Sequence, residues 1–337
     1  MKKEYNVAIM GATGAVGEVM LDILEQRKFP VKNLKLLASE RSVGKEMKYQ
    51  GRTLKVELLD NNSFKGVDIV LASAGASISK MFVKDILEAK ALMIDNSSAF
   101  RMDEGVPLVI PEINPEDCRL HNGVIANPNC TTIIALVPLK PLHDAAKIKR
   151  LIVSSYQAAS GAGAKGMAEL EQQARDWAAG KPLKVEKFAH QLLFNVIPHI
   201  DVFYEDGYTK EEMKVVHETH KIMHAPEMRI TATTVRVPVL RAHSESINIE
   251  TEIKLTVKEC RELLAKAPGV TLEDDFHNKK YPMPINAAGK DDVYVGRIRE
   301  DFSIDKGLNL WVAGDQIRKG AALNAVQIAE IVAKEGL

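Results

Sequence analysis

The sequence predicts two domains, a doubly wound α/β domain followed by an α+β domain with a largely antiparallel sheet. The chain has 337 residues, about twice the usual length of one domain. In the first third, short apolar segments alternate with helical patterns, as in parallel βαβ units. From about residue 148, apolar residues alternate with polar ones, as in antiparallel strands that cover a core on one side. We expect the first domain at 1–129, completed by a C-terminal helix within 317–337, and the second at 130–316.

The elements of both domains follow from the spacing of apolar residues. In the first domain we expect strands at 5–10, 34–38, 67–72 and 92–95, and helices at 18–27 and 79–89. In the second we expect a strand at 150–157, a helix at 167–179, and a long alternating segment at 229–257. One face of that segment would carry Ile247, Ile249, Thr251, Ile253 and Leu255. An apolar helix at 322–334 would return to pack on the first domain.

Composition and charge exclude several classes of protein. The chain has 45 Lys and Arg against 45 Asp and Glu, so its net charge provides no attraction to nucleic acid or to an anionic membrane. Its apolar runs are too short to span a bilayer, and the N-terminal segment lacks the features of a secretory signal. The 3 cysteines cannot all pair, and no Cys/His spacing indicates a metal site. We therefore expect a soluble cytoplasmic protein.

A glycine loop between the first strand and the first helix indicates a dinucleotide site. Gly11, Gly14 and Gly17 are spaced G-x-x-G-x-x-G, which departs from the usual G-x-G-x-x-G. Glycines in such a loop let the backbone approach a pyrophosphate, and they direct the amides of a helix N-terminus at it. A tight turn without a ligand is the alternative.

The residues after the second strand bear on the choice between NAD and NADP. An NAD site places an acidic residue there, to bond the ribose hydroxyls. Arg41 and the Ser42 hydroxyl suit a 2′-phosphate instead, which favours NADP. Glu40 keeps NAD open, and a solvated surface charge is the alternative for Arg41.

Cys130 differs from the other two cysteines in its surroundings. It follows the turn-forming residues 127–129 and precedes an expected helix at 132–139. At a helix N-terminus, the dipole and free amides lower the pKa of a thiol and favour the nucleophilic thiolate. Cys118 and Cys260 lack comparable neighbours. A buried structural cysteine is the alternative.

Five motifs, in order along essentially the whole chain, resemble those of aspartate-β-semialdehyde dehydrogenases. They are GATGAVG at 11–17, SSAFRM at 97–102, NPNCTT at 127–132, SYQAASGAGAKG at 155–166 and RVPVLRAHSESINIE at 236–250. The resemblance implies a Rossmann-type domain and a catalytic and dimerisation domain. It implies reduction of β-aspartyl phosphate by NADPH to aspartate semialdehyde and phosphate, in the biosynthesis of lysine, threonine, methionine and diaminopimelate. It also implies a homodimer, and the family's dimers sometimes pair into tetramers.

The same resemblance implies the roles of individual residues. Cys130 would be the nucleophile that displaces phosphate and forms an acyl-thioester, which accepts hydride far more readily than a carboxylate. His243 would be the general acid/base that takes the thiol proton and serves the hemithioacetal oxygen, and Gln157 would orient the substrate. The substrate-binding set is Arg101 and Lys214 for phosphate, Arg236 for the α-carboxylate, Glu211 for the amino group, and Asn129. The cofactor-binding set is Gly11, Thr13, Gly14, Ala15, Val16, Gly17, Arg41, Ser42, Ser160, Gly161 and Gln316.

The spacing of two implied site residues carries a structural prediction. Arg236 and His243 are seven positions apart, an odd interval that places them on opposite faces of an unbroken strand. If both face the substrate, Pro238 or a bulge at 240–242 must turn the chain, and we predict such a break.

Alternatives remain for the acidic residue and for the activity. Glu211 and Glu212 are adjacent, so helical periodicity does not choose between them, and a solvated Glu/Lys face is also open. N-acetyl-γ-glutamyl-phosphate reductase shares the chemistry, but its acetylated amine has no charge to pair with a carboxylate. Glyceraldehyde-phosphate dehydrogenase is expected to carry an acidic residue for NAD. A non-catalytic dinucleotide-binding sensor would have no need of the combined Cys130, Gln157, Arg236 and His243.

Overall fold

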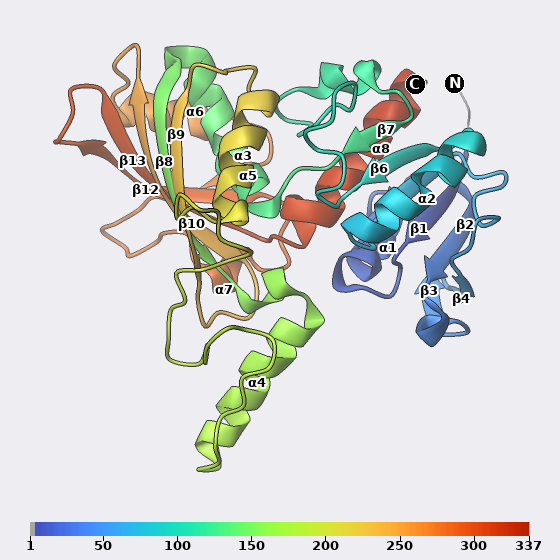
Figure 1. The fold of residues 1–337 in the computed structure, drawn as a ribbon. Coiled ribbons are helices and arrows are strands. Elements are labelled where there is room, and N and C mark those ends of the chain that lie inside the picture. Colours follow the sequence, from blue (N-terminus) through green and yellow to red (C-terminus); the bar gives the residue numbers. More distant parts are fainter. Residues whose placement is uncertain (1–3, 337) are drawn as a thin grey trace. The chain divides into compact units, whose positions relative to one another are not determined.

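The computed structural model describes residues 4–336, which divide into two compact units (Figure 1). Unit 1 runs to Asn129 and resumes at Ala321, and unit 2 comprises Cys130–Gly320. The chain thus returns to unit 1 a few residues after the expected position 317. Within the described residues, no helix has both the length and the apolar composition to cross a membrane.

Unit 1 is the expected doubly wound domain. Its strands are β1 (Tyr5–Met10), β2 (Val31–Ala38), β3 (Glu46–Tyr49), β4 (Arg52–Leu58), β5 (Ile69–Ala72), β6 (Leu92–Asp95) and β7 (Val124–Ala126). They form one sheet in the order β3-β4-β2-β1-β5-β6-β7, parallel except for the pair β3–β4. Its helices are α1 (Ala15–Gln26), α2 (Ala76–Glu88) and α8 (Leu323–Glu335), with short helical turns at Glu40–Ser42 and Pro115–Leu120. The chain moves outward from β1 in both directions, so right-handed crossovers place α1 and α2 on opposite faces.

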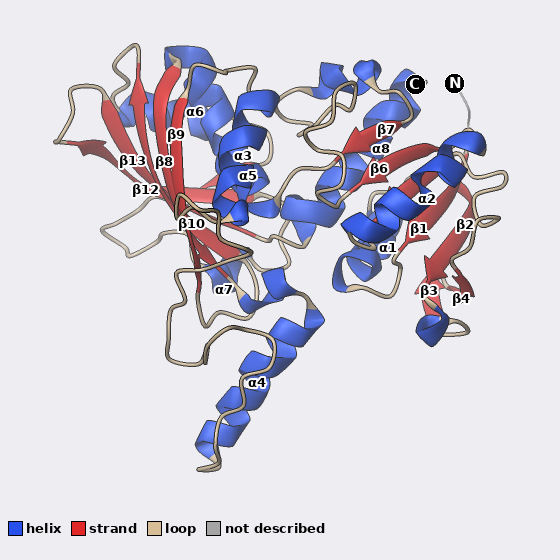
Figure 2. Cartoon of the chain, in the orientation of Figure 1, coloured by secondary structure: helices blue, strands red, loops and turns tan. Residues whose placement is uncertain are grey.

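The core of unit 1 explains why the end of the chain belongs to it. Helices α1 and α8 pack against one another and against the sheet of unit 1, whose helices and strands are distinguished in Figure 2. Ile23 and Leu24 from α1 and Val326 and Ala329 from α8 are fully buried in one apolar cluster. The apolar spacing at 322–334 therefore marks a helix that completes the first core. Strands β1 and β5 are buried along nearly their whole length, as expected of a parallel sheet covered on both faces.

Unit 2 is built on a six-stranded mixed sheet. Its strands are β8 (Ile148–Gln157), β9 (Arg229–Arg236), β10 (His243–Thr251), β11 (Val270–Leu272), β12 (Val293–Asp301) and β13 (Gly307–Gly314), in the order β11-β12-β13-β10-β8-β9. The three central pairs are antiparallel and the two edge pairs are parallel. Its helices are α3 (Cys130–Ala146), α4 (Ala164–Ala178), α5 (Lys210–Ile222), α6 (Val257–Leu264) and α7 (Pro284–Ala287), with helical turns at Ala159–Ala162 and Arg318–Ala322.

The alternating segment forms two strands, and its apolar face ends earlier than expected. Ile247, Ile249 and Thr251 are buried on β10, as the alternation predicts. The expectation for Ile253 is wrong, because that side chain is 63% exposed. The strand stops at Thr251, whose hydroxyl donates to the Ile253 carbonyl oxygen at 2.7 Å, so this local turn ends the alternation.

Helix α3 crosses the inner face of the unit 2 sheet. It contacts β8, β10, β12 and β13 as well as α5 and α6, and its residues are buried nearly all round. It continues through Pro138 and Pro141 to Ala146, whereas the sequence predicted an end near Leu139. Each internal proline removes a helical hydrogen bond. Burial of the surrounding apolar side chains offsets this cost. A local sequence pattern does not reveal that burial, so it predicted too short a helix.

Candidate active site

Three neighbouring strands of unit 2 place polar side chains in one row at the end of the sheet. Gln157 on β8 is in register with Arg236 on β9. His243 begins β10 on the other side of β8, one position beyond the registered pair Ser244–Tyr156. Registered neighbours point to the same face of a sheet. Arg236, Gln157 and His243 therefore share the face that α3 and α5 cover.

The break between Arg236 and His243 is confirmed. Strand β9 ends at Arg236 and β10 begins at His243, and β8 lies between them in the sheet. Residues 237–242 form the connecting loop, in which Ala242 adopts a left-handed conformation with φ of 71°. The seven-residue interval thus joins two separate strands. Its odd length therefore does not place Arg236 and His243 on opposite faces of the sheet.

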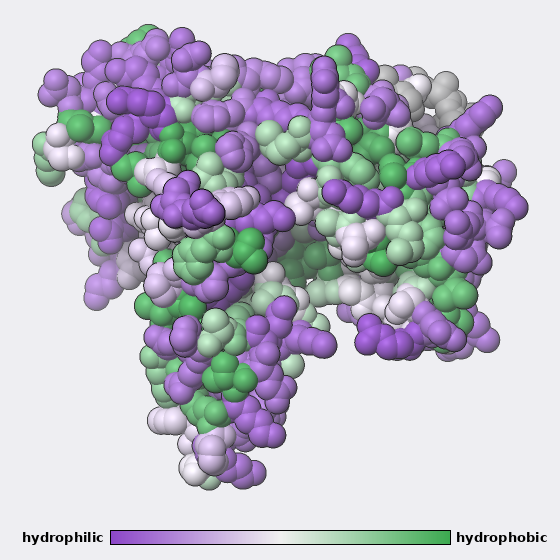
Figure 3. Space-filling model, viewed as in Figure 1, coloured by the Kyte–Doolittle hydropathy of each residue, from purple (hydrophilic) through white to green (hydrophobic). Residues whose placement is uncertain are grey.

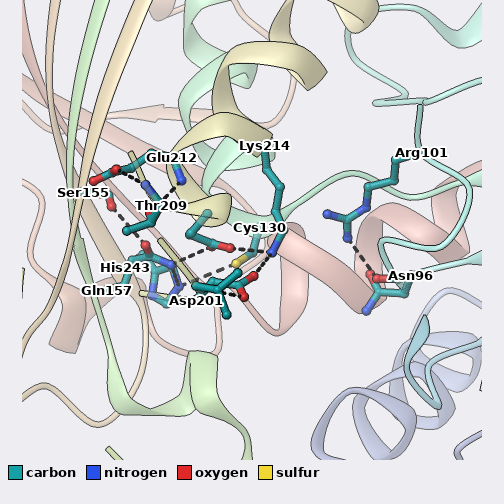
Figure 4. A network of polar contacts seen from close by, with 12 residues as sticks. Asn96, Arg101, Cys130, Ser155, Gln157, Asp201, Thr209, Glu212, Lys214 and His243 are labelled. Carbon is teal, nitrogen blue, oxygen red and sulfur yellow. Dashed lines mark hydrogen bonds and ion pairs between the residues drawn. The ribbon is translucent and has the colours of Figure 1, made fainter. Parts of the chain in front are cut away.

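Cys130 is the first residue of α3 and contacts the row of polar side chains. Its Sγ lies 3.6 Å from Nε2 of His243, and Figure 4 shows the two side chains directed at one another. Helix α3 therefore provides the helix N-terminus that the sequence predicted for this thiol. Gly320 leaves room for the Cys130 side chain, because a Cβ on residue 320 would lie 2.9 Å from the Cys130 Cβ.

Gly161 marks the point on which Arg236 and His243 converge. A Cβ at this position would lie 2.7 Å from Nη1 of Arg236 and 3.2 Å from Nε2 of His243. Only a glycine leaves this space open. The Arg236 guanidinium also lies over the Phe188 ring, 5.9 Å from its centroid.

The Ala158 peptide holds both of these side chains. Its N–H donates to Nδ1 of His243 at 3.0 Å, and its carbonyl oxygen accepts from Nη1 of Arg236 at 2.6 Å. His243 is fully buried, and burial together with the charge of Arg236 lowers its pKa well below the usual value.

Helix α5 supplies an acidic and a basic side chain, and the two adjacent glutamates differ in role. Glu211 accepts from Gln157 Nε2 at 3.2 Å and from Lys214 Nζ at 2.8 Å. Glu212 instead accepts from the backbone of Thr209 at 2.7 Å and of Thr234 at 2.9 Å, so it caps α5 and fixes the helix to β9. Glu211 is thus the glutamate next to Gln157.

Lys214 is held as a charged side chain. Burial would lower its pKa, but Glu211 and Asp201 together raise the pKa to about 12. Its Nζ donates to Asp201 at 2.8 Å as well as to Glu211. Because Glu211 is buried and the Lys214 side chain is mostly buried with it, a solvated Glu/Lys face is not what α5 presents here.

A second polar row lies two residues back along the same strands. The Ser155 hydroxyl donates to Oε1 of Gln157 at 3.1 Å, which fixes the orientation of that amide. Glu245 is registered opposite Ser155, is fully buried, and has its pKa raised well above the usual value by that burial. This burial disfavours the charged form of the Glu245 carboxyl, which lies two residues along β10 from His243.

The glycine loop in unit 1 has the shape of a phosphate cradle. Gly11 has φ of 88°, and a Cβ there would lie 2.7 Å from the Ser73 carbonyl oxygen. A Cβ on Gly17 would lie 2.3 Å from the Gly11 carbonyl oxygen, so strand and helix meet closely. At Gly14, the N-cap of α1, the nearest protein atom would be 3.4 Å away, and no side chain caps the helix.

The other predicted cofactor residues fall into two places. In unit 1 the Thr13 hydroxyl donates to the buried Ser42 hydroxyl at 3.0 Å, next to exposed Arg41. In unit 2, Gln316 accepts from the Ala242 N–H at 2.9 Å and donates to the Ser160 hydroxyl. Gln316 thus fixes the loop that leads into His243.

Two predicted substrate residues belong to unit 1. Arg101 is buried and donates to the carbonyl oxygens of Asn127 at 2.9 Å and of Asn96 at 3.0 Å. Asn129 is buried directly before Cys130 in the chain. The described residues contain no group of three or more His, Cys, Asp or Glu that could hold a metal ion.

Sequence reasoning missed three residues that support the site. Ser155, Ala158 and Asp201 orient Gln157, His243 and Lys214, respectively. A signal existed only for Ser155, which lies two positions before Gln157 on a predicted strand and therefore on the same face. Ala158 acts through its backbone, and Asp201 comes from a loop without a recognisable pattern.

The three cysteines should differ sharply in reactivity. Burial, with nearby carboxylates, raises the pKa of Cys118 and of Cys260 to about 12, whereas Cys130 is partly exposed at the start of α3. With iodoacetamide at neutral pH, we expect label on the Cys130 peptide alone. Peptide mapping by mass spectrometry measures this, with the unfolded protein as the control in which all 3 cysteines react. Equal labelling of Cys118 in the folded protein would contradict the assignment.

Comparison with known proteins agrees with this geometry. The family profile described as "Semialdehyde dehydrogenase, NAD binding domain" matches residues 6–121, and that described as "Semialdehyde dehydrogenase, dimerisation domain" matches 139–319. Aspartate-semialdehyde dehydrogenases of Aquifex aeolicus and Synechocystis are 55% and 54% identical to the chain, and each alignment covers at least 99% of both proteins.

The solved structures agree as well. The crystal structure of aspartate semialdehyde dehydrogenase II from Vibrio cholerae, complexed with ASA, superimposes with a TM-score of 0.96. It is 44% identical over 100% of both chains. The chain belongs to the aspartate-semialdehyde dehydrogenase family of oxidoreductases.

Proposed function

We propose that the chain reduces β-aspartyl phosphate to aspartate semialdehyde with NADPH, through an acyl-thioester on Cys130. The observation that carries this proposal is the convergence of a thiol, an imidazole and a guanidinium within unit 2. The Vibrio cholerae relative is described as complexed with ASA, which supports the same substrate for a chain that is 44% identical.

The Cys130 thiolate attacks the acyl carbon and expels phosphate, which leaves an acyl-thioester on the sulfur. Bound NADPH would supply the hydride that reduces this thioester. His243 lies beside Sγ, so it serves the substrate oxygen that becomes negative when the tetrahedral species forms. Gln157 has one amide N–H on Glu211, and its amide nitrogen lies 3.4 Å from His243, at the reacting group.

Recognition of the substrate rests on charges of opposite sign. The Arg236 guanidinium binds the α-carboxylate, for which its planar fork is the matching partner. Glu211 lies next to Gln157 and receives the substrate ammonium group. An acetylated amine would leave the buried Glu211 carboxylate without that partner, which disfavours N-acetyl-γ-glutamyl phosphate. Lys214 and Arg101 bind the phosphoryl group, and Asn129 contacts the substrate beside the thiol.

Unit 1 fits a dinucleotide, and we propose NADP. The Gly14 position, where a Cβ would fill the cradle without touching a side chain, admits the pyrophosphate to the α1 N-terminus. The residues that would hold it are Gly11–Gly17, with Arg41 and Ser42 on the 2′-phosphate. In unit 2, Ser160, Gly161 and Gln316 would contact the nicotinamide end.

A phosphate-dependent assay in the oxidative direction tests the proposed function. With aspartate semialdehyde, phosphate and NADP, we expect reduction of NADP at a rate that vanishes without phosphate. We expect NAD to support a lower kcat/KM, because Arg41 then lacks its phosphate partner. N-acetylglutamate semialdehyde is the matched alternative substrate. Faster turnover of that compound, or turnover of neither, would contradict the proposal.

We also propose that the chain forms a homodimer. In some members of the family, two such dimers associate into a tetramer. The sheet face opposite α3 and α5 exposes Tyr156 next to Trp311, with ring centroids 5.3 Å apart, beside a groove of about 440 Å³. Trp177 on α4 and Phe194 in the following loop are also exposed. Figure 3 shows that polar and apolar residues are mixed on the surface of the molecule. Exposed apolar patches of this kind are typical of protein interfaces. Sedimentation equilibrium should give twice the chain mass, and a monomer would contradict this proposal.

The location of the protein is proposed from its cysteines and its chemistry. The 3 cysteines are free in the structure, as expected in a reducing compartment. We therefore place the enzyme in the cytoplasm, as a soluble enzyme of amino-acid biosynthesis.

A further inference from the structure

We propose that Asp201 is a positioning residue for the phosphate group of the reaction. Its carboxylate fixes the Lys214 ammonium group between α5 and the loop before that helix, so that Lys214 presents one N–H to the phosphate. The proposal rests on the proposed function, in which Lys214 binds the phosphoryl group. It assigns part of the phosphate affinity to a residue that none of the five sequence motifs contains.

Lys214 is held by two carboxylates that come from different segments of unit 2. Its Nζ lies 2.8 Å from Oε2 of Glu211, one turn back on α5, and 2.8 Å from Oδ2 of Asp201 (Figure 4). With Glu211 alone, the flexible four-carbon side chain could fold back along its own helix. Asp201 adds an anchor outside α5, so the two carboxylates together fix the position of Nζ.

This arrangement leaves one donor of Lys214 for a ligand. An ammonium group has three N–H bonds. Within the described residues its acceptors are Glu211 and Asp201, so one N–H remains. The Lys214 side chain is only 18% exposed, and in such a sheltered place a charge-assisted bond to a phosphate oxygen is strong.

The Asp201 carboxylate is itself fixed by the backbone. Its Oδ1 accepts from the Val202 N–H at 3.0 Å, and its Oδ2 accepts from Lys214. Asp201 has φ of 69°, a left-handed conformation that aspartate adopts more readily than most residues. Such conformations persist where the surrounding contacts determine the backbone, and they are common at binding sites.

The loop on either side of Asp201 is tied to the elements that carry the other substrate residues. Before it, Ile197 exchanges two backbone hydrogen bonds with Arg236, at 2.8 and 2.9 Å. After it, the Lys210 N–H at the start of α5 donates to the Val202 carbonyl oxygen at 2.8 Å. Asp201 is therefore fixed relative to both Arg236 and α5.

Asp201 acts on the position of Lys214 more than on its charge. Burial would lower the pKa of Lys214, but Glu211 and Asp201 raise it to about 12. Glu211 remains when Asp201 is replaced, so we expect the ammonium group to stay charged at neutral pH. A change at Asp201 should therefore alter phosphate binding through geometry.

Initial rates in the oxidative direction test this role, with phosphate varied at saturating aspartate semialdehyde and NADP. In Asp201→Ala the KM for phosphate should rise by about tenfold or more, the usual effect of losing a hydrogen bond to a charged group. The kcat at saturating phosphate and the KM for NADP should stay within about threefold, because the thiol and the cofactor residues are unchanged. A phosphate KM that is unchanged or lower would overturn the proposal.

Asp201→Asn separates geometry from charge. Its amide keeps an oxygen that can accept from Nζ, so the phosphate KM should rise less than in Asp201→Ala. Equal rises in the two variants would mean that Asp201 acts through its charge, and the positioning role would then be wrong.

A double-mutant cycle with Lys214 distinguishes positioning from a general structural role. Asp201→Ala introduced into Lys214→Ala should change the phosphate KM by less than about twofold, because no ammonium group remains to be positioned. A further rise as large as that in the parent would overturn the proposal. So would a parental phosphate KM in Lys214→Ala. The proposed function is judged separately, by whether turnover of the parent requires phosphate.

Asp206→Ala is the matched control from the same loop. Its Oδ1 accepts from the Tyr208 N–H at 3.0 Å, a contact of the same kind as that between Asp201 and Val202. The substitution removes a contact within the loop but leaves Lys214 with both of its carboxylates, so the phosphate KM should match that of the parent. A rise comparable to that of Asp201→Ala would show that the loop as a whole sets the phosphate affinity, which contradicts the proposal.

Discussion

Replacing Cys130 with alanine should abolish turnover while the protein still binds NADPH. Without the thiolate no acyl-thioester forms, and removal of a covalent nucleophile typically lowers kcat by about 10⁴-fold or more. The glycine loop lies in unit 1 and makes its contacts there, so NADPH affinity should change less than about threefold. The phosphate-dependent assay measures the first quantity, and a fluorescence titration with NADPH measures the second.

Cys118→Ala is the matched control for this prediction. Cys118 is a buried cysteine of unit 1, with its pKa raised to about 12 mainly by burial, so its loss removes packing and no chemistry. We expect its kcat to stay close to that of the parent. Turnover of Cys130→Ala at a comparable rate would mean that the reaction has no thioester intermediate.

Replacing Arg236 with lysine should lower kcat/KM by about 10²- to 10³-fold, mostly through a higher KM. The guanidinium is held by the Ala158 carbonyl oxygen and the Phe188 ring, and a lysine ammonium cannot reproduce a planar fork at that place. Loss of a buried, hydrogen-bonded charge contact commonly costs about 2–5 kcal/mol. Initial rates with varied aspartate semialdehyde measure the effect.

Arg229→Lys is the control from the same strand. Arg229 begins β9, is largely exposed, and pairs with Glu250 at 3.3 Å. A surface pair of this kind contributes little, so we expect kinetic constants within about twofold of the parent. If Arg236→Lys kept the parent KM, Arg236 would not be the carboxylate-binding residue.

Much of unit 1 could be predicted from the sequence because its signals are local. Strand β1 is a short, almost continuously buried segment that ends at a glycine loop, and α1 follows with its apolar residues at helical spacing. The return of α8 could also be predicted, because its apolar face needs a core. The short strands β3 and β4 were not predicted, since they carry mostly exposed polar residues.

The site in unit 2 depends on contacts between distant segments. Arg236, Gln157 and His243 meet because β8 pairs with both β9 and β10, and no local pattern encodes that strand order. Resemblance to a family identified these residues, but register explains why they share a face. The choice between Glu211 and Glu212 is of the same kind, because it depends on the capping of α5 by Thr209. The role of Ala158 is carried by its backbone and leaves no trace in the sequence.

The most direct test of the central claim is to trap the acyl-enzyme. The parent protein is mixed with β-aspartyl phosphate in the absence of NADPH, quenched in acid, digested and examined by mass spectrometry. We expect one aspartyl group on the peptide that contains Cys130, absent from Cys130→Ala and lost on treatment with hydroxylamine. An unmodified Cys130 peptide, or an aspartyl group on any other residue, would contradict the account.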